Sequence, residues 1–412
     1  MRICFVVQRY GAGVVGGAES YVESMATGLA AEGHDVTVLT SCATSYADWA
    51  DVHEPGRSEE LGVTVHRFRV RAPRDNDRFF PLHLRAVDVF DVPLWPWAQD
   101  RWTQQMGPDL AGVEPVLADE AARSDATVLV GYHYAQTLRL TRVAAAHGPT
   151  IVIPTAHPEG AFHVGRVREV FEHADHVISL APEEGELIGR TYDCADRVTV
   201  VPCPVEPLQP PPADEVSRAV RRVGATEGRY AVVVGRVDPA KGSDDVIRFT
   251  AEYRRMVDPG FELVVIGPGG DGAAAVDGVR LTGFVEEADK RALVAGSAVV
   301  VQPSYMESFS LALIEGWLLG RPALVQGRSR VLDGHVRRSG GGLAYTDYLS
   351  YEAALATLAA RPEVAASLAA RGRRYSLHEF AWERVAPAFL EVVASTAASG
   401  GRRLAARSRV VR

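Results

Sequence analysis

The sequence predicts an α/β protein of two domains, each a doubly wound parallel sheet of the Rossmann type. Short apolar runs alternate along the chain with longer segments of helical periodicity, which is typical of parallel strands covered by helices on both faces. The alternation occurs twice, before and after a proline-rich segment. A chain of 412 residues also has the length of two or three domains.

The first series of apolar runs predicts the strands of the N-terminal domain. These runs are Ile3–Gln8, Val36–Thr40, Val63–Val70, Thr127–Val130, Thr150–Pro154, His176–Ser179 and Val198–Val201. A helical pattern at Ala18–Glu32, closed by Gly33, separates the first two runs. A strand, a glycine loop, a helix and a second strand open a doubly wound domain, which we place at residues 1–203.

A cluster of prolines marks the end of this domain. The prolines are Pro202, Pro204, Pro207, Pro210, Pro211 and Pro212. Proline interrupts both helices and central strands, so we predict a linker over residues 204–226. The second series of runs is Tyr230–Val234, Phe261–Ile266, Val279–Thr282, Ala298–Val301 and Pro322–Val325. It predicts a second domain at residues 227–378, a return helix over 379–398 and a disordered basic tail over 399–412.

Composition excludes several classes of protein. The net charge of −8 argues against a general nucleic-acid binder, which needs a basic face. The four cysteines form no C-x-x-C pair, so we expect neither a zinc site nor a disulfide framework. Free cysteines are typical of a reducing compartment, so we expect a cytoplasmic location. The first apolar run is cut by Arg9 and is too short for a signal peptide, and no run is long enough for a transmembrane helix.

Residues 66–106 depart from the strand–helix scheme, because arginines and aromatic residues are concentrated there. They include Arg67, Arg69, Arg71, Arg74, Arg78, Arg85, Phe79, Phe80, Trp95, Trp97 and Trp102. Three interpretations stay open: a packed insertion, an acceptor-binding surface, or peripheral contact with the inner membrane surface. The same stretch contains Asp75-Asn76-Asp77, a D-x-D pattern of the kind that can bind a metal ion. This pattern does not lie beside a strand expected to bind a nucleotide, so we expect no metal role for it.

Two loops have the composition of anion-binding turns. Gly16 and Gly17 precede the first predicted helix, where paired glycines allow close approach to backbone N–H groups. Arg236 and Lys241 flank a turn between the first strand of the second domain and the helix at Asp244–Met256. Two cations beside a helix N-terminus are what a diphosphate requires, although a loop of solvated charges is the alternative.

The segment from Glu307 to Glu315 carries the strongest signal. It reads Glu-Ser-Phe-Ser-Leu-Ala-Leu-Ile-Glu, directly after a buried strand, and its second glutamate falls on the apolar helix Leu311–Leu319. A carboxylate on such a helix needs polar partners, because burial of an unpaired charge is costly. Ribose or sugar hydroxyls would be suitable partners.

With these motifs, the sequence resembles the family 4 retaining glycosyltransferases over nearly its whole length. The resemblance includes the N-terminal glycine loop, Gly33-His34-Asp35-Val36, Leu281-Thr282-Gly283-Phe284-Val285, the paired glutamates and Phe380-Ala381-Trp382. It implies the GT-B fold, in which two Rossmann-like domains face each other and a C-terminal helix crosses back to the first domain.

The resemblance also implies a role for each motif residue. Arg236 and Lys241 would hold the donor diphosphate, Glu307 would lie beside the transferred sugar, and Glu315 would bind the ribose. Further donor contacts are implied for Gly16, Gly17, Phe284, Val285, Ser308, Phe309, Ser310 and Leu311.

Two histidines follow predicted strands of the first domain, His133 in Gly-Tyr-His-Tyr and His157 in Pro-Thr-Ala-His. Ligands bind at the carboxyl ends of parallel strands, and the family places a histidine at each of these ends. We favour His133 for contact with the donor sugar; a structural or solvated histidine is the alternative.

The sequence departs from the family pattern at three places. Ser308 and Ser310 replace glycines of a common E-G-F-G motif, Pro202-Cys203-Pro204-Val205 replaces a strand end in asparagine-glycine, and Gln326–Arg330 replaces a glycine-rich loop. We therefore transfer the reaction class but not the substrate.

The predicted function is that of a retaining hexosyltransferase, which moves a sugar from a UDP- or GDP-linked donor to an acceptor hydroxyl without a metal. We expect no cofactor besides the nucleotide sugar, which is a co-substrate. The acceptor is a glycan, a lipid-linked molecule or a small molecule, and nucleic acid is not expected as a partner. The alternatives are an epimerase or hydrolase of the same fold, or a catalytically silent sugar-nucleotide-binding protein.

Overall fold

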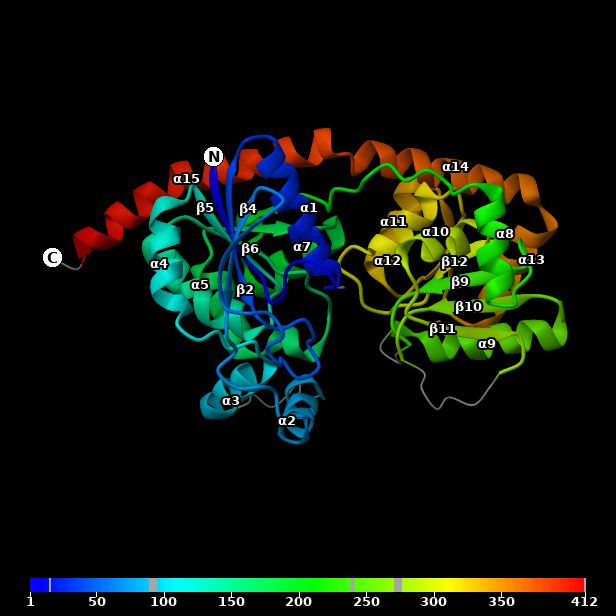
Figure 1. Cartoon of the computed structure of the whole chain (residues 1–412), viewed down its shortest axis with the longest axis horizontal. Coiled ribbons are helices and arrows are strands. Elements are labelled where there is room, and N and C mark those ends of the chain that lie inside the picture. The colour runs from blue at the N-terminus through cyan, green and yellow to red at the C-terminus, as the bar shows by residue number, and fades with distance from the viewer. Residues whose placement is uncertain (15, 89–94, 238–240, 270–275, 411–412) are drawn as a thin grey trace. The chain divides into compact units, whose positions relative to one another are not determined.

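The computed structural model describes the chain from residue 1 to 410 except residues 15, 89–94, 238–240 and 270–275, and it divides into two compact units (Figure 1). Unit 1 comprises Met1–Pro204 and Glu383–Arg412, and unit 2 comprises Val205–Trp382. Each unit has its own parallel sheet with helices against both faces (Figure 1). The prediction of two Rossmann-like domains is confirmed.

The strands of unit 1 begin and end close to the predicted apolar runs. They are β1 (Arg2–Val6), β2 (Asp35–Ser41), β3 (Gly56–Glu60), β4 (Val63–Phe68), β5 (Ala126–Val130), β6 (Thr150–Ile153), β7 (His176–Ser179) and β8 (Val198–Val200). The α-helices are α1 (Gly17–Ala31), α2 (Asn76–Asp88), α3 (Pro96–Met106), α4 (Val113–Arg123), α5 (Ala135–His147), α6 (Gly165–His173), α7 (Pro182–Tyr192) and α15 (Trp382–Val410). Short 3₁₀ turns occupy Gly160–His163 and Ala195–Arg197.

The sheet of unit 1 has the strand order β3-β4-β2-β1-β5-β6-β7-β8. All neighbouring strands are parallel except β3 and β4, which form an antiparallel pair at the edge. Chain order reverses direction between β1 and β5, which makes this the topological switch point of the sheet.

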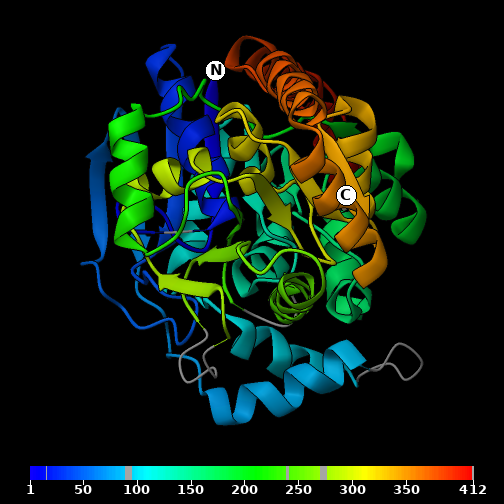
Figure 2. The same cartoon turned by 90° about the vertical axis from the view of Figure 1, so that its right-hand side faces the viewer.

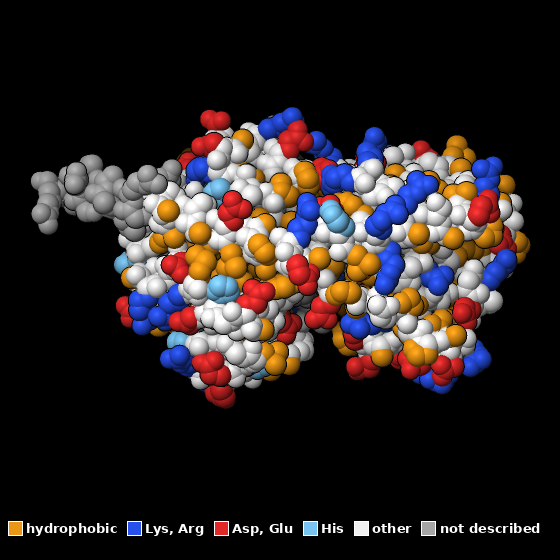
Figure 3. Space-filling model, turned by 90° about the horizontal axis from the view of Figure 1, so that it is seen from above, with side chains coloured by type: hydrophobic (Ala, Val, Ile, Leu, Met, Phe, Trp, Pro, Cys, Tyr) orange, Lys and Arg blue, Asp and Glu red, His pale blue; other side chains and the backbone are white. Residues whose placement is uncertain are grey.

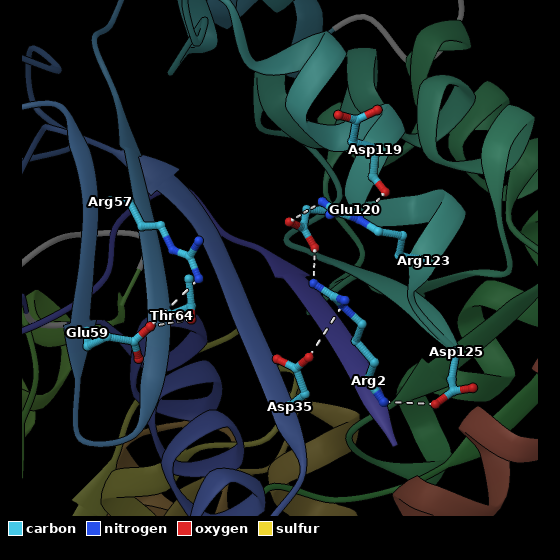
Figure 4. A network of polar contacts seen from close by, with 9 residues as sticks. All are labelled: Arg2, Asp35, Arg57, Glu59, Thr64, Asp119, Glu120, Arg123 and Asp125. Carbon is cyan, nitrogen blue, oxygen red and sulfur yellow. Dashed lines mark hydrogen bonds and ion pairs between the residues drawn. The ribbon is translucent and has the colours of Figure 1, made fainter.

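The amino-terminal edge of this sheet is held by ion pairs (Figure 4). Arg2 donates its backbone N–H to Asp125 at 2.8 Å, and its guanidinium lies 3.5 Å from Asp35 and 3.4 Å from Glu120. Arg123 donates to the other oxygen of Glu120 at 2.9 Å. This charge network lies at the end of the strands away from their carboxyl edge, and it has a structural role.

Unit 2 has six parallel strands in the order β11-β10-β9-β12-β13-β14. They are β9 (Tyr230–Val234), β10 (Glu262–Ile266), β11 (Val279–Gly283), β12 (Val299–Gln302), β13 (Ala323–Gln326) and β14 (Gly342–Tyr345). The helices are α8 (Ala213–Arg222), α9 (Ser243–Met256), α10 (Glu287–Ala295), α11 (Leu311–Leu318), α12 (Arg330–Ser339), α13 (Tyr348–Ala360) and α14 (Pro362–Glu379). Its switch point lies between β9 and β12.

Several elements differ from the prediction. Residues 213–222, expected to lie in the linker, form α8, which packs against α10, because Val216, Ala219 and Val220 give it a buried apolar face. The last helix, expected to end at residue 398, continues as α15 to Val410, since alanine, leucine and arginine are strong helix formers. Strands β3 and β14 were not predicted, because Gly-Arg-Ser-Glu-Glu contains no apolar run and the apolar run of Gly-Leu-Ala-Tyr is only three residues long.

The insertion at residues 66–106 contains α2 and α3, which pack side by side (Figures 1 and 2). Trp102 and Phe79 are buried in the core of unit 1, so the interpretation as a packed insertion holds for them. In contrast, Trp95 is 72% exposed and Trp97 is 65% exposed, and Phe80 on α2 is also exposed. Packing therefore explains only part of this aromatic stretch.

Charged side chains of both signs are interspersed on the face shown in Figure 3, as expected of an ordinary acidic globular protein. All four cysteines are buried thiols. Among the residues that the structure describes, none of the helices is long and apolar enough to span a membrane.

Candidate functional site

The carboxyl edge of the unit 2 sheet brings two predicted motifs together. The loop after β9 contains Arg236 and Lys241, and the loop after β12 contains Glu307. Because β9 and β12 are neighbours at the switch point, their loops border the crevice where ligands bind in open α/β sheets.

The ion pair of Lys241 and Glu307 joins these loops, with Lys241 Nζ donating to Glu307 Oε1 at 2.8 Å. The Glu307 side chain is 15% exposed and that of Lys241 is 37% exposed, so solvent and ligands can reach the ammonium group. Gly242 allows the loops after β9 and β12 to lie this close together. It caps α9 with φ of +69°, and a Cβ atom there would lie 2.3 Å from the carbonyl oxygen of Pro303.

Arg236 lies on the same loop, with an exposed side chain. Its carbonyl oxygen accepts a hydrogen bond from Ser243 Oγ at 3.2 Å, which ties the start of the loop to the first turn of α9. The next residue, Val237, donates to Pro268 at 2.9 Å and extends the pairing of β9 with β10. The middle of the motif, residues 238–240, lies outside the described residues.

The start of α11 adds a helix N-terminus to this edge. Ser310 caps the helix with φ of +77°, a left-handed conformation that glycine adopts without strain and serine does not. Ser308 lies in the same loop and is partly buried, and Leu311 begins the helix. The first turn of a helix leaves backbone N–H groups without intrahelical partners, so this end suits an anion or sugar hydroxyls.

Phe309 anchors the loop by packing into an aromatic cluster behind it. Its ring lies 5.5 Å from that of His335 and 5.0 Å from that of Phe380, both in edge-to-face geometry. Burial lowers the pKa of His335 to about 3, so this imidazole is neutral at physiological pH. Phe309 is itself 3% exposed, so its buried side chain supports the loop.

Glu315 is paired with Lys290 of α10, which donates to Glu315 Oε2 at 3.0 Å. Burial would lower the pKa of Lys290, but Glu315 and Glu287 raise it, so the ammonium is charged. Sequence reasoning predicted that Glu315 needs a polar partner but did not identify Lys290. The signal was weak, because Lys290 lies among other charged residues in the sequence.

Phe284 and Val285 follow the end of β11 on the same edge. Phe284 is 69% exposed, and Val285 is partly buried. Gly267 donates to the carbonyl of Gly283 at 3.0 Å, so glycines hold the ends of β10 and β11 together there. An exposed aromatic ring beside open backbone is suited to contact a nucleotide base, which stays a prediction.

The switch point of unit 1 contains the predicted glycine turn. Gly16 and Gly17 begin α1, and a Cβ atom at Gly16 would lie 2.1 Å from Glu19 Oε2. Glu19 is buried and paired with Arg9 at 2.6 Å. Sequence reasoning missed this pair, although Arg9 after an apolar strand and Glu19 in the first turn of a helix were visible signals. The Arg9–Glu19 ion pair fixes the conformation of the glycine turn.

The loops after β5 and β6 form a second polar cluster in unit 1, around His133 and His157. Burial lowers the pKa of His133 to about 4, and its Nδ1 has no hydrogen-bond partner among the described residues. His157 Nδ1 lies 3.5 Å from Glu159 Oε1, and the buried Tyr132 donates its hydroxyl to the same oxygen. Sequence reasoning identified both histidines but not Tyr132 or Glu159.

Comparison with protein families identifies the chain. Residues 16–204 match the glycosyl transferase 4-like domain, and residues 228–359 match glycosyl transferases group 1. The chain is a family 4 glycosyltransferase. It is 28% identical to the D-inositol 3-phosphate glycosyltransferase of Rhodococcus opacus, over 92% of this chain and 86% of that one. It is 32% identical to the enzyme of the same name from Saccharomonospora viridis, over 63% of each chain.

The glycosyltransferase also has the GT-B fold that the resemblance implied. Its structure is similar to that of Anabaena Alr3699/HepE in complex with UDP-glucose, with a TM-score of 0.68 and 16% sequence identity, over 96% of this chain and 100% of that one. The family and the fold are therefore confirmed, while the roles of individual residues stay predictions.

The D-x-D segment has a structural explanation in this glycosyltransferase. Asp75 Oδ1 accepts a hydrogen bond from the Arg78 backbone at 3.2 Å, so Asp75 caps α2. In the described part of the chain, no three His, Cys, Asp or Glu side chains are grouped so that they could hold a metal ion.

Proposed function

We propose that this glycosyltransferase moves a hexosyl group from a nucleotide diphosphate sugar to an acceptor hydroxyl, with retention of the anomeric configuration. The observation that carries the proposal is the Lys241–Glu307 pair at the switch point of unit 2, where a cation for phosphate and a carboxylate for sugar hydroxyls lie 2.8 Å apart.

Fixed protein groups would offset the charge of the donor. A nucleotide diphosphate brings about two negative charges that must leave water on binding, and either a metal or protein cations must balance them. Lys241, Arg236 and the N-terminus of α11 supply positive charge at one edge of one sheet. We therefore propose transfer without a metal and without a cofactor besides the nucleotide sugar.

The reaction breaks two bonds and forms two, because the acceptor exchanges its proton for the sugar and the diphosphate does the reverse. The acceptor oxygen bonds to the anomeric carbon as the bond from this carbon to the diphosphate oxygen breaks, and the acceptor proton leaves with the diphosphate. Negative charge grows on the leaving diphosphate, and Lys241 would stabilise this charge. Loss of one such preorganised donor typically lowers the rate by about 10²–10³. Glu307 accepts sugar hydroxyls beside Lys241.

The comparisons support a choice of donor and acceptor to test. HepE is described in complex with UDP-glucose, which supports UDP over GDP as the nucleotide. The relatives named D-inositol 3-phosphate glycosyltransferases support a phosphorylated polyol as acceptor. We also propose that the enzyme acts in the cytoplasm.

A thermal-shift panel of UDP- and GDP-linked sugars tests donor binding. A donor at 100 times its dissociation constant adds about 2.7 kcal/mol to the free energy of unfolding. Proton NMR of the product then shows whether the anomeric configuration is retained. If no nucleotide sugar raises the unfolding temperature, or if nucleotide release never depends on an acceptor, the transferase proposal is wrong and a hydrolase, an epimerase or a different ligand class takes its place.

A further inference from the structure

The loop after β6 in unit 1 is held in a strained conformation. Thr155 has φ of +52°, a left-handed value that is a genuine outlier for a β-branched residue. Such strain costs about 1–3 kcal/mol and persists only where the surroundings enforce it, most often at functional sites.

Glu184, on α7, holds this conformation in place through hydrogen bonds to the backbone. Its buried carboxyl group accepts the N–H of Ala156 at 2.5 Å and that of Leu180 at 2.6 Å, so it joins the end of β6 to the end of β7. A relaxation of Thr155 that moves the Ala156 N–H would break its hydrogen bond to the buried Glu184. The loop is therefore preorganised, and it continues after Ala156 with His157 and, two residues later, Glu159.

Glu159 is the residue of this loop whose carboxylate is partly accessible to a ligand. Its Oε1 is engaged by the Tyr132 hydroxyl and lies 3.5 Å from His157, whereas its Oε2 has no partner in the described part of the chain. The side chain is 24% exposed. Burial would raise the pKa of Glu159, but His157, His133 and Tyr132 lower it, so the carboxylate is ionised. One oxygen is fixed and the other is available.

An ionised carboxylate in this position selects for hydroxyl donors. It accepts short, charge-assisted O–H···O⁻ bonds, and it repels phosphate, so it would contact the ring of a phosphorylated polyol and not its phosphate. Its position at the carboxyl end of β6, in the unit that does not contain Lys241 and Glu307, favours the acceptor over the donor diphosphate.

We infer that Glu159 is a specificity-determining residue whose Oε2 accepts a hydroxyl group of a polyhydroxylated acceptor, while the Tyr132 hydroxyl holds Oε1. The inference rests on the proposed function and adds the chemistry by which the acceptor is recognised.

Steady-state kinetics of Glu159→Gln test the inference, with UDP-glucose as donor and a panel of D-inositol 3-phosphate, inositol and linear polyols as acceptors. UDP release without acceptor reports on the donor site alone. We expect the acceptor KM to rise about tenfold to a hundredfold, as for loss of a hydrogen bond to a charged group, and the donor KM to change far less. Glu172→Gln, an exposed glutamate of α6 in the same unit, is the matched control and should leave both KM values unchanged.

Two further measurements separate recognition from a merely structural role. Tyr132→Phe keeps the carboxylate but releases Oε1, so it should raise the acceptor KM by less than Glu159→Gln does. A monodeoxy acceptor that lacks the recognised hydroxyl should bind the wild type more weakly but bind Glu159→Gln no more weakly than the parent acceptor. If Glu159→Gln does not fold, the acceptor KM of Tyr132→Phe decides alone.

The outcomes are distinguishable. A wild type whose UDP release no acceptor stimulates overturns both the proposed function and this inference. A wild type with acceptor-stimulated release, together with unchanged acceptor KM in folded Glu159→Gln or Tyr132→Phe, overturns the inference and leaves the proposed function standing.

Discussion

Gly242 offers the sharpest test of how the donor site is built. In Gly242→Ala, the new methyl group would lie 2.3 Å from the carbonyl oxygen and 3.0 Å from the carbonyl carbon of Pro303. Both are backbone atoms, so no flexible side chain can move aside. The loops after β9 and β12 must separate, which would pull Lys241 away from Glu307.

The expected loss of stability has two parts. An L-residue at φ of +69° costs about 1–2 kcal/mol in the left-handed region. Overpacking against the Pro303 backbone adds about 1–3 kcal/mol. Gly320→Ala is the matched control, because Gly320 has φ of +77° at the end of α11 but no atom within 4 Å of the new Cβ. The difference between the two variants therefore isolates the clash.

Urea unfolding and calorimetric titration with UDP-glucose measure both effects. We expect Gly242→Ala to be less stable than Gly320→Ala by about 1–3 kcal/mol and to bind the donor more weakly, whereas Gly320→Ala keeps wild-type donor affinity. Equal stability of the two variants, or unchanged donor affinity in Gly242→Ala, would refute the view that close approach at Pro303 forms the site.

Three further predictions concern other residues. Glu315→Ala should weaken donor binding by about 1.5–3 kcal/mol, since a charged acceptor is lost and Lys290 loses a partner; an unchanged dissociation constant in calorimetry removes Glu315 from the site. Replacing the exposed Trp95 and Trp97 with alanine should change the acceptor KM far more than the donor KM, and binding of the wild type to anionic liposomes in flotation would instead favour membrane contact. The folded-state pKa of His133, about 4, is below the unfolded value of 6.5, so its contribution to stability is present above pH 6.5 and is lost as the pH falls toward 4. An NMR titration that shows His133 protonated near pH 6.5 would contradict this burial.

The strand series was predictable because parallel strands covered on both faces are continuous apolar runs. His176–Ser179 and Tyr230–Val234 begin and end at the predicted residues for this reason. The edge strand β3 has polar residues, and β14 has a glycine and a short apolar stretch, so neither is distinguishable from a loop by periodicity. The helix α8 was concealed by the prolines before it, although proline at a helix start is favourable.

The site was predictable where a motif lies in one segment, and it was not where partners come from distant segments. Lys241 and Glu307 were each identified by their own loops, and the sheet order then brings them together. Lys290 and Glu159 have no local signal, because their roles depend on Glu315 and Tyr132. Hydrogen bonds between segments are set by packing, which periodicity does not report.

The most direct test of the central claim is acceptor-dependent release of UDP from UDP-glucose in excess EDTA. If Lys241 and Arg236 hold the donor diphosphate as proposed, release persists in EDTA, Lys241→Ala lowers it by about 10²–10³, and added Mn²⁺ does not restore the variant. Complete loss of release in EDTA, with recovery on addition of Mn²⁺ to the wild type, would contradict the account and make Asp75 and Asp77 candidates for metal ligands.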